Sequence, residues 1–121
     1  MADRDNIFIT LCKDQSFGGT DTYEILPGER PLDVGNFNTA ILYAVGKGMT
    51  SAPDVVVETT MDYNQATWPI PVAAFAVTTT GETKQIKATD TTPLYRWLRV
   101  KVGKASGSYS GRVTITLLLK R

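Results

Sequence analysis

The sequence consists largely of short runs in which apolar and polar residues alternate, separated by turns rich in glycine, proline, asparagine and aspartate. Threonine, valine and isoleucine fill these runs, and no segment shows the 3.6-residue period of an amphipathic helix. A period of two places successive side chains on opposite faces, which is the pattern of a half-buried β-strand. The pattern therefore predicts an all-β fold with no substantial helix.

The alternation predicts about eight strands, at residues 6–12, 20–26, 37–45, 55–61, 70–77, 83–89, 94–102 and 112–120. The first strand places Ile7, Ile9 and Leu11 on one face. The third places its large apolar residues on one face: Phe37, Ile41, Tyr43 and Val45. We expect this strand to end at the glycines that follow, Gly46 and Gly48. The glycine- and serine-rich stretch 104–111 predicts a flexible hairpin loop. Many short strands at this spacing are typical of an antiparallel β-sandwich of jelly-roll type, and a closed barrel is the structural alternative.

The length of 121 residues, 42% of them hydrophobic, is that of one domain with a core of its own. We therefore expect a single domain over residues 1–121, with residues 1–6 as an extended N-terminal arm. The start of the chain lacks the basic and then apolar regions of a secretion signal. The longest apolar run there, Ile7 to Ile9, is too short to span a membrane. These features predict synthesis in a host cytoplasm and no membrane span.

The sequence has no histidine and one cysteine, which removes the commonest general base, the commonest metal ligand and any disulfide framework. Cys12 falls within an apolar alternation, and we expect it to be a small buried side chain. Glu58 and Asp62 are the acid pair closest to a hydrolytic arrangement, but no second carboxylate is placed opposite either one. Asp3 and Asp5 alternate without the rest of a calcium loop, which leaves weakly bound calcium as an alternative. We therefore expect that the protein is not an enzyme and that it binds no cofactor and no metal.

Charge is divided unevenly along the chain. Residues 1–83 contain four basic and eleven acidic residues, a net −7, whereas residues 84–121 contain nine basic residues and one acidic residue, a net +8. Three interpretations follow: acidic and basic strands pair within the fold, one side of the molecule is acidic and the other basic for ordered assembly, or the basic strands bind nucleic acid. The overall net charge of +1 argues against nucleic acid.

Six residues are candidate interface or ligand contacts. In the run 94–102, Leu98, Val100 and Val102 are predicted to face the core. The opposite face holds Trp97 with basic neighbours, which suits contact with a partner or a groove. Two further aromatic residues flank the turn after residue 61, where a ring could stack on a sugar, although a tryptophan there could equally close the end of the sandwich. The candidates are Trp97, Arg96, Arg99, Lys101, Tyr63 and Trp68.

Residues 54–119 resemble the second half of small β-sandwich binding and virion proteins. The stretch Val55–Asp62 followed by Trp68 is similar to the strand–turn–tryptophan pattern of discoidin-like jelly rolls. Pro93–Val100 and Arg112–Leu117 resemble their later strands. The chain departs from that family in having Tyr63-Asn64 at the turn glycine and in lacking the paired cysteines. The same layout is similar to small structural proteins of tailed bacteriophages, such as head decoration and tail-associated proteins.

The resemblance implies a non-enzymatic structural protein of a phage particle, most simply a head decoration or auxiliary capsid protein. Such a protein would be a homo-oligomer that contacts the major capsid protein or other virion proteins through many weak contacts. Exposed edges such as Thr83–Thr89, and the terminal residues Met1–Asn6, are expected to pair with neighbouring subunits or with the shell. The alternative is a carbohydrate-binding module or a tail-associated adhesion protein, with glycan as the ligand.

Overall fold

The computed structural model describes residues 6–26, 31–35, 37–62, 64, 70–87 and 96–121, and nine strands lie in these ranges. The strands are β1 (Asn6–Thr20), β2 (Tyr23–Leu26), β3 (Leu32–Asp33), β4 (Thr39–Thr50), β5 (Asp54–Thr60), β6 (Ile70–Ala76), β7 (Glu82–Lys87), β8 (Trp97–Gly103) and β9 (Ser108–Lys120). The described part of the chain contains no helix. The prediction of an all-β fold is confirmed.

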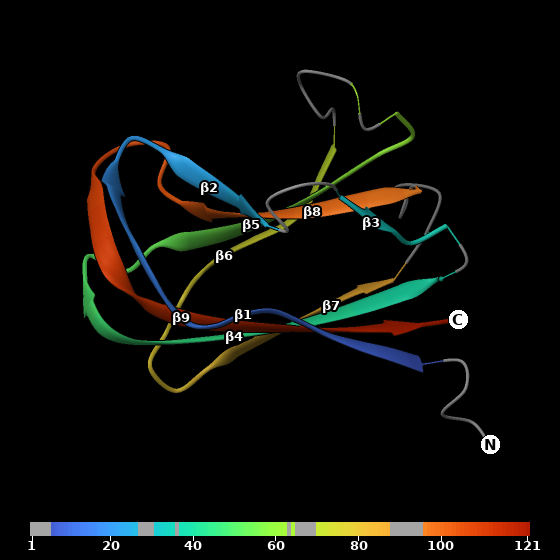
Figure 1. The fold of residues 1–121 in the computed structure, drawn as a ribbon, viewed down its shortest axis with the longest axis horizontal. Helices are drawn as coiled ribbons and strands as arrows, with labels where there is room; N and C mark the ends of the chain where they lie inside the picture. The colour runs from blue at the N-terminus through green and yellow to red at the C-terminus, as the bar shows by residue number, and fades with distance from the viewer. Residues whose placement is uncertain (1–5, 27–30, 36, 63, 65–69, 88–95) are drawn as a thin grey trace.

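The strands form two antiparallel sheets that pack face to face, as Figure 1 shows. One sheet has the order β1-β9-β4-β7, and the other has the order β2-β8-β5-β6 with β3 also paired to β8. If β2 and β3 are counted as one interrupted strand, the first strand pairs with the last, the second with the second-last, and so on inward. This nested pairing defines a jelly roll. The predicted sandwich is therefore confirmed, and the barrel alternative is wrong.

The core lies between the sheets and is built from the alternate residues of each strand. On β8 the predicted core residues Leu98, Val100 and Val102 are fully buried. On β4 the core face carries Ala40, Leu42 and Ala44. Fully buried residues on several other strands complete the core, including Val55, Val57, Val113, Ile115 and Leu117.

The predicted apolar face of β4 points away from the core. Ile41, Tyr43 and Val45 alternate with the buried residues of this strand, and Tyr43 is exposed. Phe37 precedes the strand and packs partly buried against the core. Both faces of β4 therefore carry apolar side chains, so the pattern alone does not distinguish the core face.

Strand β1 is much longer than predicted, because it continues past Cys12 to Thr20. Its pairing with β9 shifts register between Thr10 and Cys12 and again between Cys12 and Gln15. Asp14 within the second shift has a φ of 51°. Each bulge adds a residue and interrupts the period of two, so the strand pattern is lost although the pairing resumes. As a result, the segment predicted at residues 20–26 begins only at Tyr23.

The glycines that were expected to end strands lie inside them. Strand β4 passes through Gly46 and Gly48, and its register with β9 shifts between Lys47 and Thr50. Gly48 has a φ of 61°, so it bends the strand without ending it. Strand β9 likewise begins at Ser108, inside the predicted loop 104–111, and its second residue, Tyr109, is buried.

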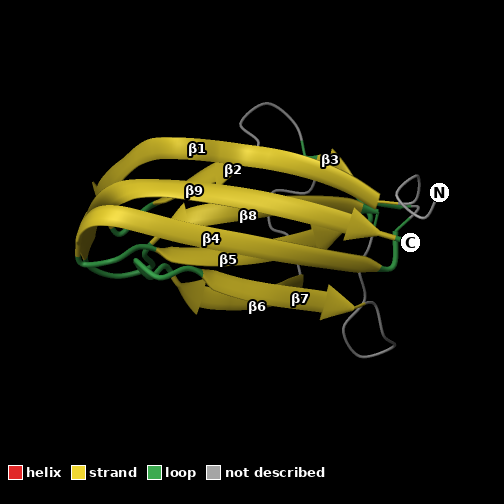
Figure 2. Cartoon of the chain, turned by 90° about the horizontal axis from the view of Figure 1, so that it is seen from below, coloured by secondary structure: helices red, strands yellow, loops and turns green. Residues whose placement is uncertain are grey.

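The first and last strands pair with each other, so the start of β1 and the end of β9 lie together at one end of the molecule. The start of β1 and the end of β9 are antiparallel partners, with Asn6 opposite Lys120. Figure 2 shows β1 at the margin of its sheet, beside β9, with β4 on the other side of β9. Residue 6, which was assigned to an extended arm, is therefore part of a strand. Residues 1–5 lie outside the described residues.

Candidate functional site

The outer face of the second sheet holds a cluster of charged residues, which we call the Glu58 cluster (Tyr23, Glu58, Arg99 and Lys101). Glu58 on β5 lies directly opposite Arg99 on β8, and Lys101 is on the same face two residues further along β8. The Arg99 Nε donates to Glu58 Oε1 at 2.8 Å, and the Lys101 Nζ lies 3.2 Å from Glu58 Oε2. The antiparallel register thus gives one carboxylate two cationic partners.

The Glu58 cluster is largely removed from solvent although it faces away from the core. Glu58 is only 7% exposed, and the ammonium of Lys101 lies 4.6 Å from the centre of the Tyr23 ring. Thr60, on the same face of β5, is fully buried. A buried carboxylate held by two cations is the arrangement of a structural ion-pair network.

Trp97 and Arg96 lie at the start of β8. Trp97 is on the face away from the core, as predicted, and it is only 9% exposed. Little of its ring is therefore open to solvent, and its role as a contact residue stays a prediction. The guanidinium of Arg96 lies 4.8 Å from the centre of the Trp97 ring and 3.3 Å from Asp33 Oδ2. Stacking of the cation on the ring helps to hold both side chains in place. Tyr63 and Trp68 lie outside the described residues.

The ion pairs join the acidic and basic parts of the sequence within one molecule. Four of the five ion pairs among the described residues connect an acidic residue before position 84 to a basic residue after it: Asp14–Arg112, Asp33–Arg96, Glu58–Arg99 and Glu58–Lys101. The interpretation that the two charge classes pair inside the fold is therefore confirmed for these residues. Arg96, Arg99 and Lys101 consequently have intramolecular partners, which weakens the case for docking through their charges.

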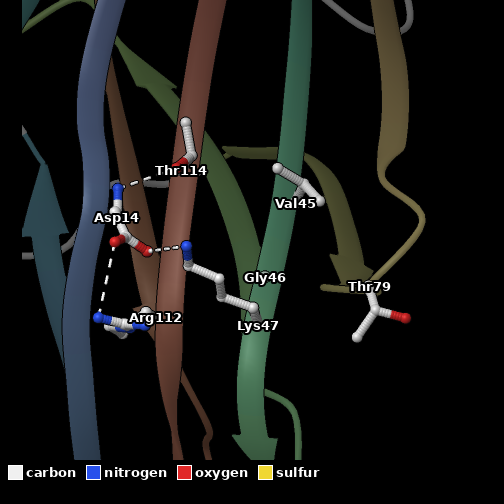
Figure 3. A pocket seen from close by; sticks show the side chains of 7 residues that line it. All are labelled: Asp14, Val45, Gly46, Lys47, Thr79, Arg112 and Thr114. Atoms are coloured by element: carbon white, nitrogen blue, oxygen red, sulfur yellow. Dashed lines mark hydrogen bonds and ion pairs between the residues drawn. The ribbon is translucent and has the colours of Figure 1, made fainter.

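A pocket of about 250 Å³ lies on the outer face of the first sheet, at the second bulge of β1. Figure 3 shows Asp14 between two cations, with its Oδ1 3.4 Å from Lys47 Nζ and its Oδ2 3.7 Å from Arg112 Nη1. The Asp14 N–H donates to Thr114 Oγ1 at 2.8 Å. The side chains of Lys47 and Arg112 are more than half exposed. The remaining lining residues are Val45, Gly46 and Thr79.

This Asp14 pocket offers hydrogen-bond donors on two cations and two hydroxyls, and one carboxylate as an acceptor. Such a set suits a polar, hydroxylated or acidic ligand, but it contains no nucleophile with a base beside it. The sequence analysis did not identify these residues. In the sequence, the pocket is indicated only by the charged pair Lys13-Asp14, which interrupts the alternation of β1. The partners of Asp14, Lys47 on β4 and Arg112 on β9, lie far away in the sequence.

The acidic candidates have structural roles where the structure describes them. Asp62 Oδ1 accepts a hydrogen bond from the Asn64 N–H at 3.0 Å, which closes a turn, as expected for a capping residue. Asp3 and Asp5 lie outside the described residues. Within the described ranges, no three histidine, cysteine or acidic side chains come together as a metal site. No helix long and apolar enough to cross a membrane occurs there either.

Cys12 is buried, as predicted, and its Sγ donates to the carbonyl oxygen of Val113 at 3.4 Å. Burial raises the pKa of the Cys12 thiol, because the thiolate would lose its hydration. The negative charge of Glu24 acts in the same direction. A thiol in this environment is a poor nucleophile, so it is not a candidate catalytic group.

The raised pKa of Cys12 makes the free energy of unfolding pH-dependent. Above the ordinary thiol pKa of about 8.5, the unfolded chain loses the proton while the folded chain keeps it. Stability should therefore fall with rising pH until the folded pKa is reached, by at most about 1.4 kcal/mol per pH unit. Denaturant unfolding between pH 7 and 10 measures this, with Cys12→Ala as the control that lacks the contribution. Parallel declines in the two proteins would contradict the assignment.

Comparisons with known proteins place the chain by fold alone. Its sequence matches no known family model, and no curated protein matches it. Among solved structures, a subunit of the disulfide-linked pili that form Bacillus endospore appendages is similar, with a TM-score of 0.53 and 13% identity. That match covers 96% of this chain and 85% of the other. At such low identity the likeness shows a shared fold and nothing more.

Two other solved structures are similar over most of this chain. A protein of infectious bursal disease virus has a TM-score of 0.47 and 8% identity, over 95% of this chain and 32% of its own. A family 29 carbohydrate-binding module has a TM-score of 0.43 and 12% identity, over 95% of this chain and 91% of its own. Jelly rolls serve as capsid and lectin domains, so the fold is compatible with a structural or a binding protein.

Proposed function

We propose that this chain is a non-enzymatic structural subunit of a virus particle, specifically a head decoration or auxiliary capsid protein of a tailed bacteriophage. It would act in the virion through many weak contacts with the major capsid protein, with other virion proteins and with copies of itself. The proposal combines the jelly-roll fold, the sequence resemblance to small phage proteins, and a surface suited to protein contact.

The observation that carries the proposal is an exposed apolar row at one end of the first sheet. Phe8 on β1 lies opposite Leu118 on β9, and Leu118 lies opposite Ile41 on β4. These three side chains share the outer face of the sheet, and Phe8 is 73% exposed. Tyr43, also exposed, lies two residues further along β4 on the same face. Contiguous apolar surface is typical of sites of protein contact, and it supports the proposal.

The candidate basic residues Arg96, Arg99 and Lys101 already have acidic partners within the molecule, which supports contact through apolar surface rather than through these charges. The similar Bacillus protein forms pili, which supports a jelly roll of this size as a repeating subunit. Its disulfide linkage is not expected here, since the one cysteine of this chain is buried. We therefore propose assembly through non-covalent contacts.

The experiment that tests the proposal is detection of the chain in purified virus particles from the organism that encodes it. A structural subunit should be present at a fixed copy number per particle. A chain found only outside the particles would contradict the proposal.

A second candidate, glycan binding, is favoured by the Asp14 pocket, whose donors and acceptor match a hydroxylated or acidic sugar. Glycan binding would replace the structural role as the proposed function if virus particles lacked the chain and a glycan array showed binding that Arg112→Ala abolishes. Failure of the array would remove this second candidate.

A further inference from the structure

The sheet edges differ in how they are protected against pairing with another chain. Natural edge strands are guarded by proline, by lysine, by short length, by bulges or by charges that point inward. Strand β6 contains Pro71, and β7 contains Lys84 and Lys87. Strand β3 has two residues, and β2 has four, with Glu24 on the side of the strand that faces the core.

Strand β1 is guarded over only part of its length. Its 15 residues lie at the margin of the first sheet, where β9 is its one neighbour among the described strands. From residue 11 onward it carries two bulges and the charged pair Lys13-Asp14. The segment before the first bulge, Asn6–Thr10, has no charge, no proline and no bulge. The segment Gln15–Thr20, beyond the second bulge, lacks these guards as well, but of the two only Asn6–Thr10 exposes large apolar side chains.

The segment Asn6–Thr10 is largely apolar, and its large side chains are exposed. Ile7 is 44% exposed and Phe8 73% exposed, although both belong to a regular strand paired with β9. Within the described part of the chain no strand pairs with the other side of this segment, so its outward backbone N–H and C=O groups are open to another strand. Another strand placed there would satisfy the backbone groups and cover the apolar surface at the same time.

We infer that a second copy of this chain adds to this edge, with Asn6–Thr10 of the two copies paired antiparallel about a two-fold axis at Phe8. The inference rests on the proposed function, since it names one of the partners of the same surface. The occupant is a second copy because the segment complements itself: it is uncharged throughout, so a two-fold axis brings no like charges together.

The register follows from the alternation of the strand. In an antiparallel pair, opposite residues must point to the same face, so their numbers must add up to an even number. A sum of 16 is the register that uses all five residues of Asn6–Thr10 and stops at the first bulge. It places Phe8 opposite Phe8 of the second copy and Asn6 opposite Thr10. The two four-stranded sheets then become one continuous sheet across the dimer.

A contact made by five residues from each strand buries less surface than a stable interface, which typically buries about 1,200–2,000 Å². The isolated dimer should therefore be weak, and repeated use on a particle would add strength by avidity. This matches a subunit that assembles on a surface and remains dispersed before it does.

Cross-linking with a short bismaleimide tests the inference on the full chain. Phe8→Cys should give covalent dimers at least tenfold faster than Ser16→Cys, which is exposed on the same strand beyond both bulges. The native chain gives the background, because its single thiol is buried. A mixture of Asn6→Cys with Thr10→Cys should cross-link faster than either variant alone. Circular dichroism verifies that each variant is folded.

Equal rates for folded Phe8→Cys and Ser16→Cys would overturn the self-pairing, and no gain in the mixture would overturn the register. Either failure, with the chain still present in particles, would remove this inference and leave the proposed function in place. Absence of the chain from particles would remove the proposed function itself.

Discussion

A Gly103→Ala variant is expected to lose about 3 kcal/mol of folding free energy. Gly103 ends β8 with a φ of 156°, and an added Cβ would overlap the carbonyl oxygen of Thr22 and press on the Cα of Tyr23. Both are backbone atoms of the segment that enters β2, so no side chain can rotate away. For a domain of this size the loss corresponds to a fall in Tm of about 10–15 °C.

Two other glycines serve as matched controls for this prediction. Gly107 also has a positive φ, of 103°, but nothing lies within 4 Å of an added Cβ, so Gly107→Ala reports the backbone cost alone. Gly18 has ordinary contacts and no positive φ, so Gly18→Ala should leave Tm nearly unchanged. Thermal unfolding of the three variants provides the measurement. A Gly103→Ala protein as stable as Gly107→Ala would contradict the packing of β2 against β8.

Replacement of Glu58 by glutamine should lower the free energy of unfolding by about 3 kcal/mol, because it leaves Arg99 and Lys101 without their common anion in a desolvated site. An exposed pair gives the comparison: Lys47→Ala breaks a contact in which the lysine side chain is 63% exposed, and it should cost under about 1 kcal/mol. Urea unfolding at neutral pH measures both.

A triple variant separates the charge effect from packing at the same site. Glu58→Leu with Arg99→Met and Lys101→Met replaces the whole network by apolar side chains, and it should recover most of the lost stability. If Glu58→Gln costs no more than Lys47→Ala, the cluster contributes little and the account of this face is wrong.

The alternation in the sequence was sufficient to predict the fold class, because the core-facing residues of β5, β8 and β9 keep a strict period of two. It failed where the backbone departs from that period. The bulges around Cys12 hid the second half of β1, and Gly48 bends a strand that continues. Local propensity describes one residue at a time, whereas these features depend on pairing with β9.

The candidate site was predictable only in part. The face of Trp97 followed from alternation, but its burial did not, because burial depends on what else lies over that face. The pairing of Glu58 with Arg99 joins residues 41 positions apart in sequence. The Asp14 pocket draws on three strands whose register is set by the whole sandwich. Such contacts become visible only when the strand order is known.

The most direct test of the central claim is the copy number of this chain in virus particles assembled with variants at its exposed apolar end. Quantitative mass spectrometry of purified particles would compare the native chain, Phe8→Lys and Met61→Lys. Met61 is a matched control, since it is 65% exposed but lies in the turn after β5. We expect a fixed copy number for the native chain and Met61→Lys, and a fall of at least tenfold for Phe8→Lys. Particles that lack the native chain, or that take up folded Phe8→Lys equally well, would contradict the account.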